Sequence, residues 1–232
     1  MLDRRLFLVT AGAGLLAGCA RPRRSSSSAA TPVRAIRVVR PADPPSSVGT
    51  FASLYGPRPN EPFPIPAVPR GIVDERHWRR RVDNPFPDER PGTIIVDPHA
   101  YSLHLVEPRG TAMRYGVGVG RQGFSWSGIA RLQFKRRWPR WKVPDEMIAR
   151  DPSLAKWSVE NGGMPPGLDN PLGARALYLF QNGEDTLYRI HGTPEAKSIG
   201  RSVSSGCIRM LNQDVIDLFD RATHGARVIV RD

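Results

Sequence analysis

Cysteine is nearly absent from this chain of 232 residues, where it occurs only at positions 19 and 207. Two cysteines cannot build the network of bridges that holds small exported domains together, and alone they cannot form a structural zinc site. If Cys19 is used elsewhere, Cys207 has no partner for an intramolecular disulfide. A single thiol of this kind is either buried or used in chemistry.

A long apolar run is also lacking at the N-terminus, where the apolar residues from Leu6 to Leu16 are too few to span a bilayer. They follow Arg4-Arg5 and end in Leu16-Ala17-Gly18-Cys19, a pattern typical of a lipoprotein signal peptide. We therefore expect a signal peptide over residues 1–18, export by the Tat or the Sec route, and lipidation of Cys19. Ala20 is not the aspartate that in many bacteria retains lipoproteins in the inner membrane. This favours the periplasm and an outer-membrane anchor.

Acidic residues are in deficit, with 22 Asp and Glu against 34 Lys and Arg and a formal net charge of +12. In a cytosolic protein this balance would suggest nucleic acid, but export leads us to expect no nucleic-acid partner. The envelope instead offers anionic lipid head groups and peptide carboxylates. The densest basic stretch, from Arg131 to Lys142, predicts either a solvated strand edge and loop or a carboxylate-binding surface.

Residues 19–90 differ in composition from the rest of the chain. The stretch 20–90 holds 13 of the 23 prolines, includes four consecutive serines at 25–28, and shows no sustained apolar periodicity. Such a composition predicts a largely extended tether between the lipid and a folded domain. Phe51, Leu54, Tyr55 and Ile65 are the residues of this stretch that could dock on that domain.

Residues 91–232 predict a single folded domain, because short β-type runs follow one another at regular spacing. The expected strands cover residues 93–96, 101–106, 114–119, 176–180, 186–191 and 227–230. One helix is expected over residues 212–221, with Asn212 as its N-cap and Val215, Ile216, Leu218 and Phe219 on its apolar face. Many short strands with few helices indicate a mainly β sandwich or barrel.

The residues best suited to chemistry are His191 and, sixteen positions later, Cys207. A thiol is a strong nucleophile only as the thiolate, and a neighbouring imidazole can remove its proton and return it to a leaving amine. Gly206 permits the tight backbone in which consecutive N–H groups, those of Gly206 and Cys207, face an oxyanion. Arg209 is placed to meet a substrate carboxylate or to orient the loop.

Each of these residues also has an ordinary structural interpretation. A lone cysteine is usually a small buried apolar residue, and a lone histidine usually fills a structural position. The other histidines, at positions 77, 99, 104 and 224, have no comparable context and are expected to be structural or exposed.

Three ordered blocks together resemble the L,D-transpeptidase catalytic-domain family. The first is His191-Gly192-Thr193 with Ser205-Gly206-Cys207-Ile208-Arg209-Met210. The second, Gly167-Leu168-Asp169-Asn170-Pro171-Leu172-Gly173, resembles the Gly-Pro-x-Asn-Pro-Leu-Gly loop of that family. The third, Trp138-Pro139-Arg140-Trp141-Lys142-Val143-Pro144, is similar to its Pro-x-Trp-x-x-Pro segment. The resemblance covers roughly residues 92–231.

This resemblance implies a β-sandwich of the L,D-transpeptidase catalytic type, with a mixed sheet and a short C-terminal helix, preceded here by the Pro-rich tether. It implies that Cys207 attacks the bond between diaminopimelate and D-Ala in a peptidoglycan stem tetrapeptide, releasing D-Ala and leaving a thioester. His191 would be the base, oriented by the main-chain carbonyl of Gly192. Arg209, Ser205 and Asn170 would bind substrate. Neither a metal nor an organic cofactor is implied.

The identity of the acceptor stays open at this point. It could be a second stem peptide in a 3→3 cross-link, an outer-membrane protein N-terminus, a free D-amino acid, or water. Many family members have His where this chain has Ser205, which leaves acceptor choice more open than acylation. The stretch from Glu146 to Pro166 is long enough to form a lid over the site.

Two other interpretations remain. Another cysteine peptidase or a sortase-like acyltransferase is the nearest enzymatic rival, although papain-like peptidases place Cys before His in the chain. A lipid-tethered, non-catalytic peptidoglycan-binding protein is the rival from another class. It would have no reason to keep an activated thiol.

Overall fold

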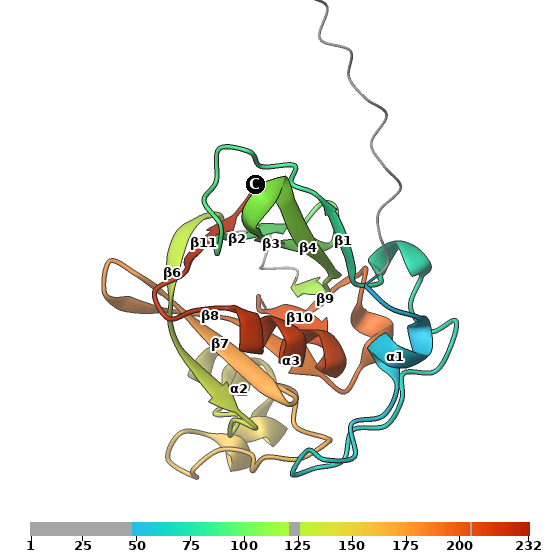
Figure 1. Ribbon diagram of the computed structural model, residues 1–232. Coiled ribbons are helices and arrows are strands. Elements are labelled where there is room, and N and C mark those ends of the chain that lie inside the picture. The colour runs from blue at the N-terminus through green and yellow to red at the C-terminus, as the bar shows by residue number, and fades with distance from the viewer. Residues whose placement is uncertain (1–47, 121–125, 205) are drawn as a thin grey trace, which may run out of the picture. The chain divides into compact units, whose positions relative to one another are not determined.

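The computed structural model describes residues 48–120, 126–204 and 206–232, which belong to one compact unit, residues 41–232 (Figure 1). Its strands are β1 (Arg80–Asp83), β2 (Ile94–Asp97), β3 (Ser102–Val106), β4 (Thr111–Gly116), β5 (Val119–Gly120), β6 (Gly128–Arg137), β7 (Arg175–Gln181), β8 (Glu184–Thr193), β9 (Ser202–Ser204), β10 (Ile208–Leu211) and β11 (Arg227–Val230). Its helices are α1 (Phe51–Tyr55), α2 (Asp145–Arg150) and α3 (Asn212–Arg221), with short 3-10 turns η1 (Glu75–His77), η2 (Pro108–Gly110), η4 (Pro152–Trp157) and η5 (Ala196–Ser198).

Nine of these strands form one mixed sheet in the order β1-β4-β3-β2-β11-β6-β7-β8-β10. The pairs β11–β2 and β10–β8 are parallel, whereas the other neighbours in this sheet are antiparallel. A separate two-stranded ladder joins β5 to β9 in parallel. The predicted mainly β fold, with a mixed sheet and a short helix near the C-terminus, is confirmed.

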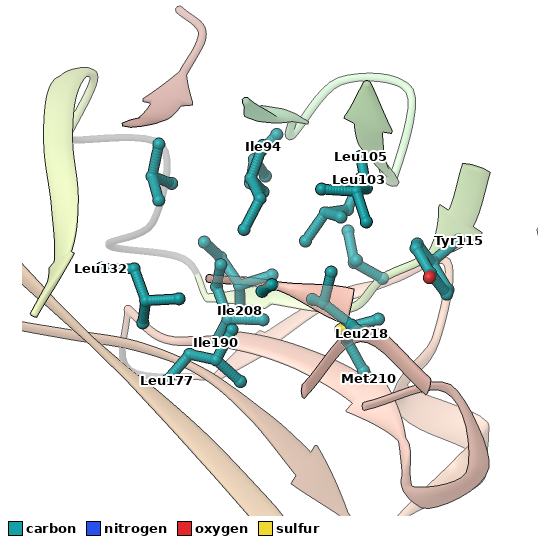
Figure 2. Packing of buried hydrophobic residues seen from close by; sticks show 14 of the residues in the cluster. Ile94, Leu103, Leu105, Tyr115, Leu132, Leu177, Ile190, Ile208, Met210 and Leu218 are labelled. Carbon is teal, nitrogen blue, oxygen red and sulfur yellow. The ribbon is translucent and has the colours of Figure 1, made fainter. Parts of the chain in front are cut away.

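The main core lies between the two halves of this sheet. Ile94 and Leu103 come from one half, Leu177 and Ile190 from the other, and all four are fully buried. Figure 2 shows the two sets of side chains facing each other across the core. The long strand β6 joins the halves, because its first residues pair with β11 and its later ones with β7. The sheet thus folds over its own apolar face, as in a sandwich.

Strand β6 overlaps the basic stretch at residues 131–137 and lies between β11 and β7, so the expected position at a sheet edge is wrong, although most side chains of this stretch are exposed as expected. Ala130 and Leu132 are buried while Ile129 and Arg131 are exposed. A bulge between Leu132 and Phe134 then interrupts this alternation. Most of the basic residues lie at the exposed positions of β6. Because the bulge interrupts the alternation, the period of two residues typical of a strand could not be recognised in the sequence.

Helix α3 covers the predicted residues, and Val215, Leu218 and Phe219 are buried as expected. Its predicted cap is wrong, because the N-cap position is Leu211 and no side chain caps the helix. Asn212 is instead buried as the first helical residue, and its Oδ1 accepts a hydrogen bond of 2.9 Å from the main-chain N–H of Ala174. The Asn212 side chain, which helix propensity predicts to cap α3, forms this tertiary hydrogen bond instead.

The predicted extended tether is wrong for residues 48–90, which pack on the domain. Leu54, Tyr55, Val68 and Val73 are buried in one apolar cluster with Ile199 and Leu211. Strand β1 adds to the sheet beside β4. These residues lie at irregular spacing along a chain that wraps over the surface, so no helical or strand period appears in the sequence. The remainder of the predicted tether, residues 19–47, lies outside the described residues.

Two buried polar contacts fix this segment further. The Glu61 carboxylate accepts hydrogen bonds from Arg175 Nη2 at 2.6 Å and Nη1 at 3.0 Å, and from Trp138 Nε1 at 2.8 Å. The Tyr55 hydroxyl accepts from the N–H of Arg79 at 2.6 Å. Because Arg175 is 1% exposed, its ion pair with Glu61 ties this segment to a buried position of the domain.

The predicted signal peptide over residues 1–18, the lipidation site Cys19 and the residue Ser205 lie outside the described residues. In the part of the chain that the structure describes, no helix has the length and apolar character needed to cross a membrane.

Candidate active site

A cavity of about 510 Å³ opens where the β7–β8–β10 part of the sheet meets the segment before and within α2. His191 and Cys207 both line it. Its wall is made by residues of β7, β8 and β10 and of three neighbouring segments: Arg140, Trp141, Lys142, Pro144, Glu146, Met147, Arg150, Pro171, Leu172, Tyr178, Thr186, Leu187, Tyr188, Arg189, Gly206 and Arg209. The structure therefore brings together the two residues that the sequence proposed for chemistry.

Strand register explains how these residues meet. Strands β8 and β10 are parallel neighbours, and Arg209 lies directly opposite His191. Alternate residues of a strand point to the same face, so Arg189 shares the face of His191. Cys207 immediately precedes β10 and lies two residues before Arg209, which is the spacing that returns to this face. No hairpin joins β8 and β10, but the two strands are adjacent in the sheet and together build the site.

His191 is 4% exposed, and its Nδ1 lies 2.6 Å from the carbonyl oxygen of Gly192. A carbonyl only accepts, so Nδ1 carries the proton in this contact and Nε2 is left as the basic nitrogen. The pKa of His191 is lowered to about 4, chiefly by burial, with the carbonyls of Gly192 and Pro171 opposing and the charges of Arg209 and Arg189 contributing. The imidazole is therefore neutral at physiological pH and able to take a proton.

The Gly192 carbonyl has the position that the resemblance implied, and close packing holds it there. A Cβ on Gly192 would collide with Asn212 Oδ1 and would stand 3.1 Å from Val215 Cγ1. A Cβ on Gly173, whose φ is +58°, would also collide with Asn212 Oδ1. Two glycines of the resembling blocks thus let Asn212 approach the turn that orients His191.

Cys207 is partly exposed, and its Sγ donates toward the carbonyl oxygen of Leu187 at 3.9 Å. Burial raises the pKa of this thiol above its ordinary value, and Asp185 acts in the same direction. The main-chain N–H of Arg189 and the charges of Arg189 and Arg209 act against that shift. The resting state is therefore a neutral thiol in the same cavity as a neutral imidazole, and the thiolate forms when a base removes the proton.

Gly206 has a φ of +127°, a conformation that side chains disfavour. A Cβ there would stand 3.2 Å from the ring of Tyr188, which in turn stacks on Trp126 with centroids 5.0 Å apart. Gly206 is buried beneath this ring. The conformation at position 206 thus favours glycine, and the ring of Tyr188 leaves little room for a side chain there. The sequence did not predict this aromatic wall.

Arg209 lines the cavity and forms an ion pair of 2.8 Å with Glu195. Its guanidinium is largely buried while the carboxylate is largely exposed. Of the two roles expected for Arg209, this contact favours orientation of the approach to β10, since its charge is already paired within the protein.

Asn170 does not reach the cavity, which corrects its assignment as a substrate-binding residue. It is fully buried, and its Nδ2 donates to the carbonyls of Pro139 and Pro165 at 3.1 and 3.0 Å. Its Oδ1 accepts from the N–H of Leu172 at 2.9 Å. The Asn170 side chain holds its own loop to the segment before Arg140. Its place in the motif is therefore explained by the folding of the cavity wall.

Helix α2 contributes Glu146, Met147 and Arg150 to the cavity wall, so the start of the expected lid lies at the site. Arg189, by contrast, was not singled out from the sequence. Its spacing of two residues from His191 on a predicted strand could have identified it.

Across residues 48–120, 126–204 and 206–232, no three His, Cys, Asp or Glu side chains gather as metal ligands.

A buried neutral imidazole and a cysteine at one cavity are the parts of a cysteine acyltransferase or hydrolase. Comparison with known proteins assigns the class more closely, because residues 91–230 match the family described as "YkuD: L,D-transpeptidase catalytic domain". The chain belongs to this family.

Three individual similarities accompany this match. The chain is 45% identical over 85 residues to the "Putative L,D-transpeptidase YqjB" of Bacillus subtilis, covering 36% of this chain and 46% of that one. It is 43% identical over 144 residues to the "Putative L,D-transpeptidase YkuD" of Bacillus licheniformis, covering 62% and 68%. A solved Brucella melitensis structure described as a "Probable carnitine operon oxidoreductase caia" is 47% identical, with 68% and 96% covered and a TM-score of 0.48. The chain spans about half the length of several curated relatives that it matches.

Proposed function

We propose that this protein is an L,D-transpeptidase that forms a thioester between Cys207 and the acyl part of a peptidoglycan stem tetrapeptide, and then transfers it to an amine. One observation carries the proposal: the Cys207 thiol and a neutral His191 imidazole, held through Nδ1, line the same cavity. Family membership supports the choice of substrate class.

In the first step, Nε2 of His191 takes the thiol proton as the sulfur attacks the carbonyl carbon of the diaminopimelate–D-Ala bond. The C–S bond forms, the C–N bond breaks, and the imidazolium returns the proton to the amine of the leaving D-Ala. The N–H groups of Gly206 and Cys207 are our candidates for stabilising the oxyanion. In the second step, an acceptor amine attacks the thioester, loses a proton to His191, and releases the thiol.

The test is a donor assay with purified protein and a synthetic stem tetrapeptide. We expect release of one D-Ala per thioester, and an adduct on Cys207 by intact-protein mass spectrometry. Cys207→Ala and Cys207→Ser should abolish both while retaining the circular-dichroism spectrum. Cys19→Ala removes the other thiol and serves as the matched control, which should retain transfer. Substantial transfer by Cys207→Ala would contradict the mechanism.

We propose two acceptor classes, a second stem peptide giving a 3→3 cross-link and an outer-membrane protein amine. Muropeptide analysis of cells with and without the protein distinguishes them, because only the first changes the cross-linked dimers. If neither product depends on the protein, both acceptor proposals fail.

We also propose that the protein works in the periplasm, attached through a lipid on Cys19 to the outer membrane. Leu16-Ala17-Gly18-Cys19 and the residue Ala20 support this proposal.

A further inference from the structure

The charges that line the cavity are unbalanced. Its wall contains five cationic side chains against one acid, Glu146; the cations are Arg140, Lys142, Arg150, Arg189 and Arg209. A concave wall of one sign concentrates ligands of the opposite sign. The cavity is therefore matched to an anionic ligand.

Arg189 and Arg209 are paired with acids of the protein. Asp185 binds Arg189 through both carboxylate oxygens, each at 2.7 Å, and Glu195 binds Arg209 at 2.8 Å. Arg189 is held further by lying over the ring of Tyr178, 4.3 Å from its centroid. These two arginines shape the electrostatics of the thiol, but their own charges are partly compensated.

Arg140 and Lys142 differ from this pair. Arg140 donates to the carbonyls of Gly162 and Gly163 at 2.8 and 3.2 Å, which orients the guanidinium without neutralising it. Neither Arg140 nor Lys142 forms an ion pair with any acid among the described residues. Both side chains are exposed toward solvent.

The backbone that carries these two cations is fixed. Trp141, between them, exchanges hydrogen bonds with Met164, N–H to O at 3.0 Å and O to N–H at 2.8 Å. Val143, which follows, is fully buried. Arg140 and Lys142 therefore present their charge from a held segment, a requirement for selective recognition.

We infer that Arg140 and Lys142 form a carboxylate-recognition site that selects acidic donor peptides, with free carboxylates, over donors whose carboxyl groups are carboxamides. The inference rests on the proposed function for the identity of the donor as a stem peptide. A carboxylate accepts charge-assisted hydrogen bonds from both cations, whereas a carboxamide of the same shape carries no charge and brings N–H groups toward donors. Discrimination follows from charge, because the two ligands have nearly equal volume.

The test uses two stem tetrapeptides that are identical except in the carboxyl groups outside the reacting bond, which are free in one and carboxamides in the other. We expect the wild type to prefer the acidic donor by roughly tenfold in kcat/KM at low salt. The preference should decline as sodium chloride is added, because these cations are exposed.

Lys142→Gln, Arg140→Gln and the double variant should each lower the ratio toward one, because they slow the acidic donor more than the carboxamide donor. Arg140→Lys keeps the charge and should retain part of the preference. Lys156→Gln is the matched control, since Lys156 is an exposed lysine of the neighbouring turn η4 that does not line the cavity. Its ratio should equal that of the wild type.

Binding to the Cys207→Ala protein, measured by calorimetry, separates this inference from the proposed function. If the wild-type protein forms no thioester with either donor, the proposed function fails. Tighter binding of the acidic peptide to Cys207→Ala would still support the charged site. Equal binding of the two peptides, a preference for the carboxamide, or an equal effect of Lys156→Gln would overturn the inference.

Discussion

Glu61→Gln is the sharpest test of the N-terminal segment, because it changes one group in the part of the chain whose sequence predicted an extended tether. The substitution keeps the size of the side chain but removes the charge that faces Arg175. That guanidinium is 1% exposed and also donates to the carbonyl of Ala174 at 2.8 Å. Without the carboxylate, a buried cation is left with neutral partners only.

Removing one partner of a buried ion pair typically destabilises a protein by about 3–5 kcal/mol. The side chain of Glu61 is 16% exposed, so water can approach the altered pair, and we reduce the expected loss to about 2–4 kcal/mol. For a chain of this size, that corresponds to a fall in melting temperature of roughly 5–15 °C.

The loss should depend on pH. Burial raises the pKa of Glu61, but the hydrogen bonds from Arg175 and Trp138 outweigh it and the net pKa is lowered. A carboxyl group with a lowered folded-state pKa stabilises the fold above its unfolded pKa of about 4.3, and this contribution is lost as the pH falls through the folded value. The difference between wild type and variant should therefore be full at about pH 7 and shrink below about pH 4.

Thermal unfolding followed by circular dichroism measures this difference. Glu184→Gln, at an exposed glutamate of the β7–β8 turn, is the control and should leave the melting temperature unchanged. The double variant Glu61→Leu/Arg175→Met removes both charges and should recover most of the loss. A Glu61→Gln protein as stable as the wild type at neutral pH would refute the packing of residues 48–90 on the domain.

Three further predictions concern the site and the anchor. His191→Ala should lower the rate of acyl transfer by roughly 10²–10⁴ near neutral pH, and the loss of rate should be smaller at high pH, where the thiol ionises unaided. In the wild type, the acid limb of the rate should lie near pH 4, because burial lowers the pKa of His191 to about 4. An acid limb at about pH 6.5 would contradict the burial argument. Gly192→Ala should cost about 1–3 kcal/mol and most of the activity, because its Cβ meets Asn212 Oδ1, while Gly167→Ala, with open space around it, should be neutral in unfolding assays; equal effects would contradict the packing argument. Cys19→Ala should move the protein from the membrane to the soluble fraction in cell fractionation, and unchanged membrane association with an uncleaved N-terminus would exclude the lipid anchor.

The sequence predicted which residues meet at the cavity better than it predicted the boundaries of the fold, for a physical reason. The roles that we propose for His191 and Cys207, a base and a nucleophile, need particular residue types that meet at one place. Such requirements remain visible in a single sequence. The sequence also predicted the β2, β3, β7 and β11 strands, whose apolar residues are consecutive or alternate clearly.

Residues 48–90 show why the rest was missed. Their prolines were counted as a sign of an extended tether, yet proline is also tolerated in a chain that packs without ladder hydrogen bonds. Leu54, Tyr55, Ile65, Val68 and Val73 are buried at intervals of one, ten, three and five residues, which match neither a helix nor a strand. A segment that wraps a domain is specified by its partner surface, here Ile199 and Leu211, and that surface is distant in sequence.

The predictions for Asn170 and Asn212 were wrong for a related reason. The family resemblance implied a substrate-binding role for Asn170, and a local rule predicted Asn212 as a helix cap, but both side chains are buried with tertiary hydrogen-bond partners. Asn170 links its loop to Pro139, 31 positions away, and Asn212 links α3 to Ala174, 38 positions away. Local sequence rules carry no information on partners at that separation, so the motif was recognised while its role was not.

The cationic cavity and the resting state of the thiol lead to one last expectation. The charges of Arg189 and Arg209 lower the pKa of Cys207 against the effect of burial. A donor carboxylate bound by Arg140 and Lys142 brings negative charge into the same cavity and weakens that effect, so the thiolate is harder to form in the complex than in the free enzyme. Proton removal by His191 should then matter more for acidic donors than for carboxamide donors. At one pH near neutrality, the rate ratio of wild type to His191→Ala should be several-fold larger with the acidic peptide. A ratio that is the same for both donors would mean that the bound carboxylate does not influence the thiol, and would separate the recognition site from the reacting centre.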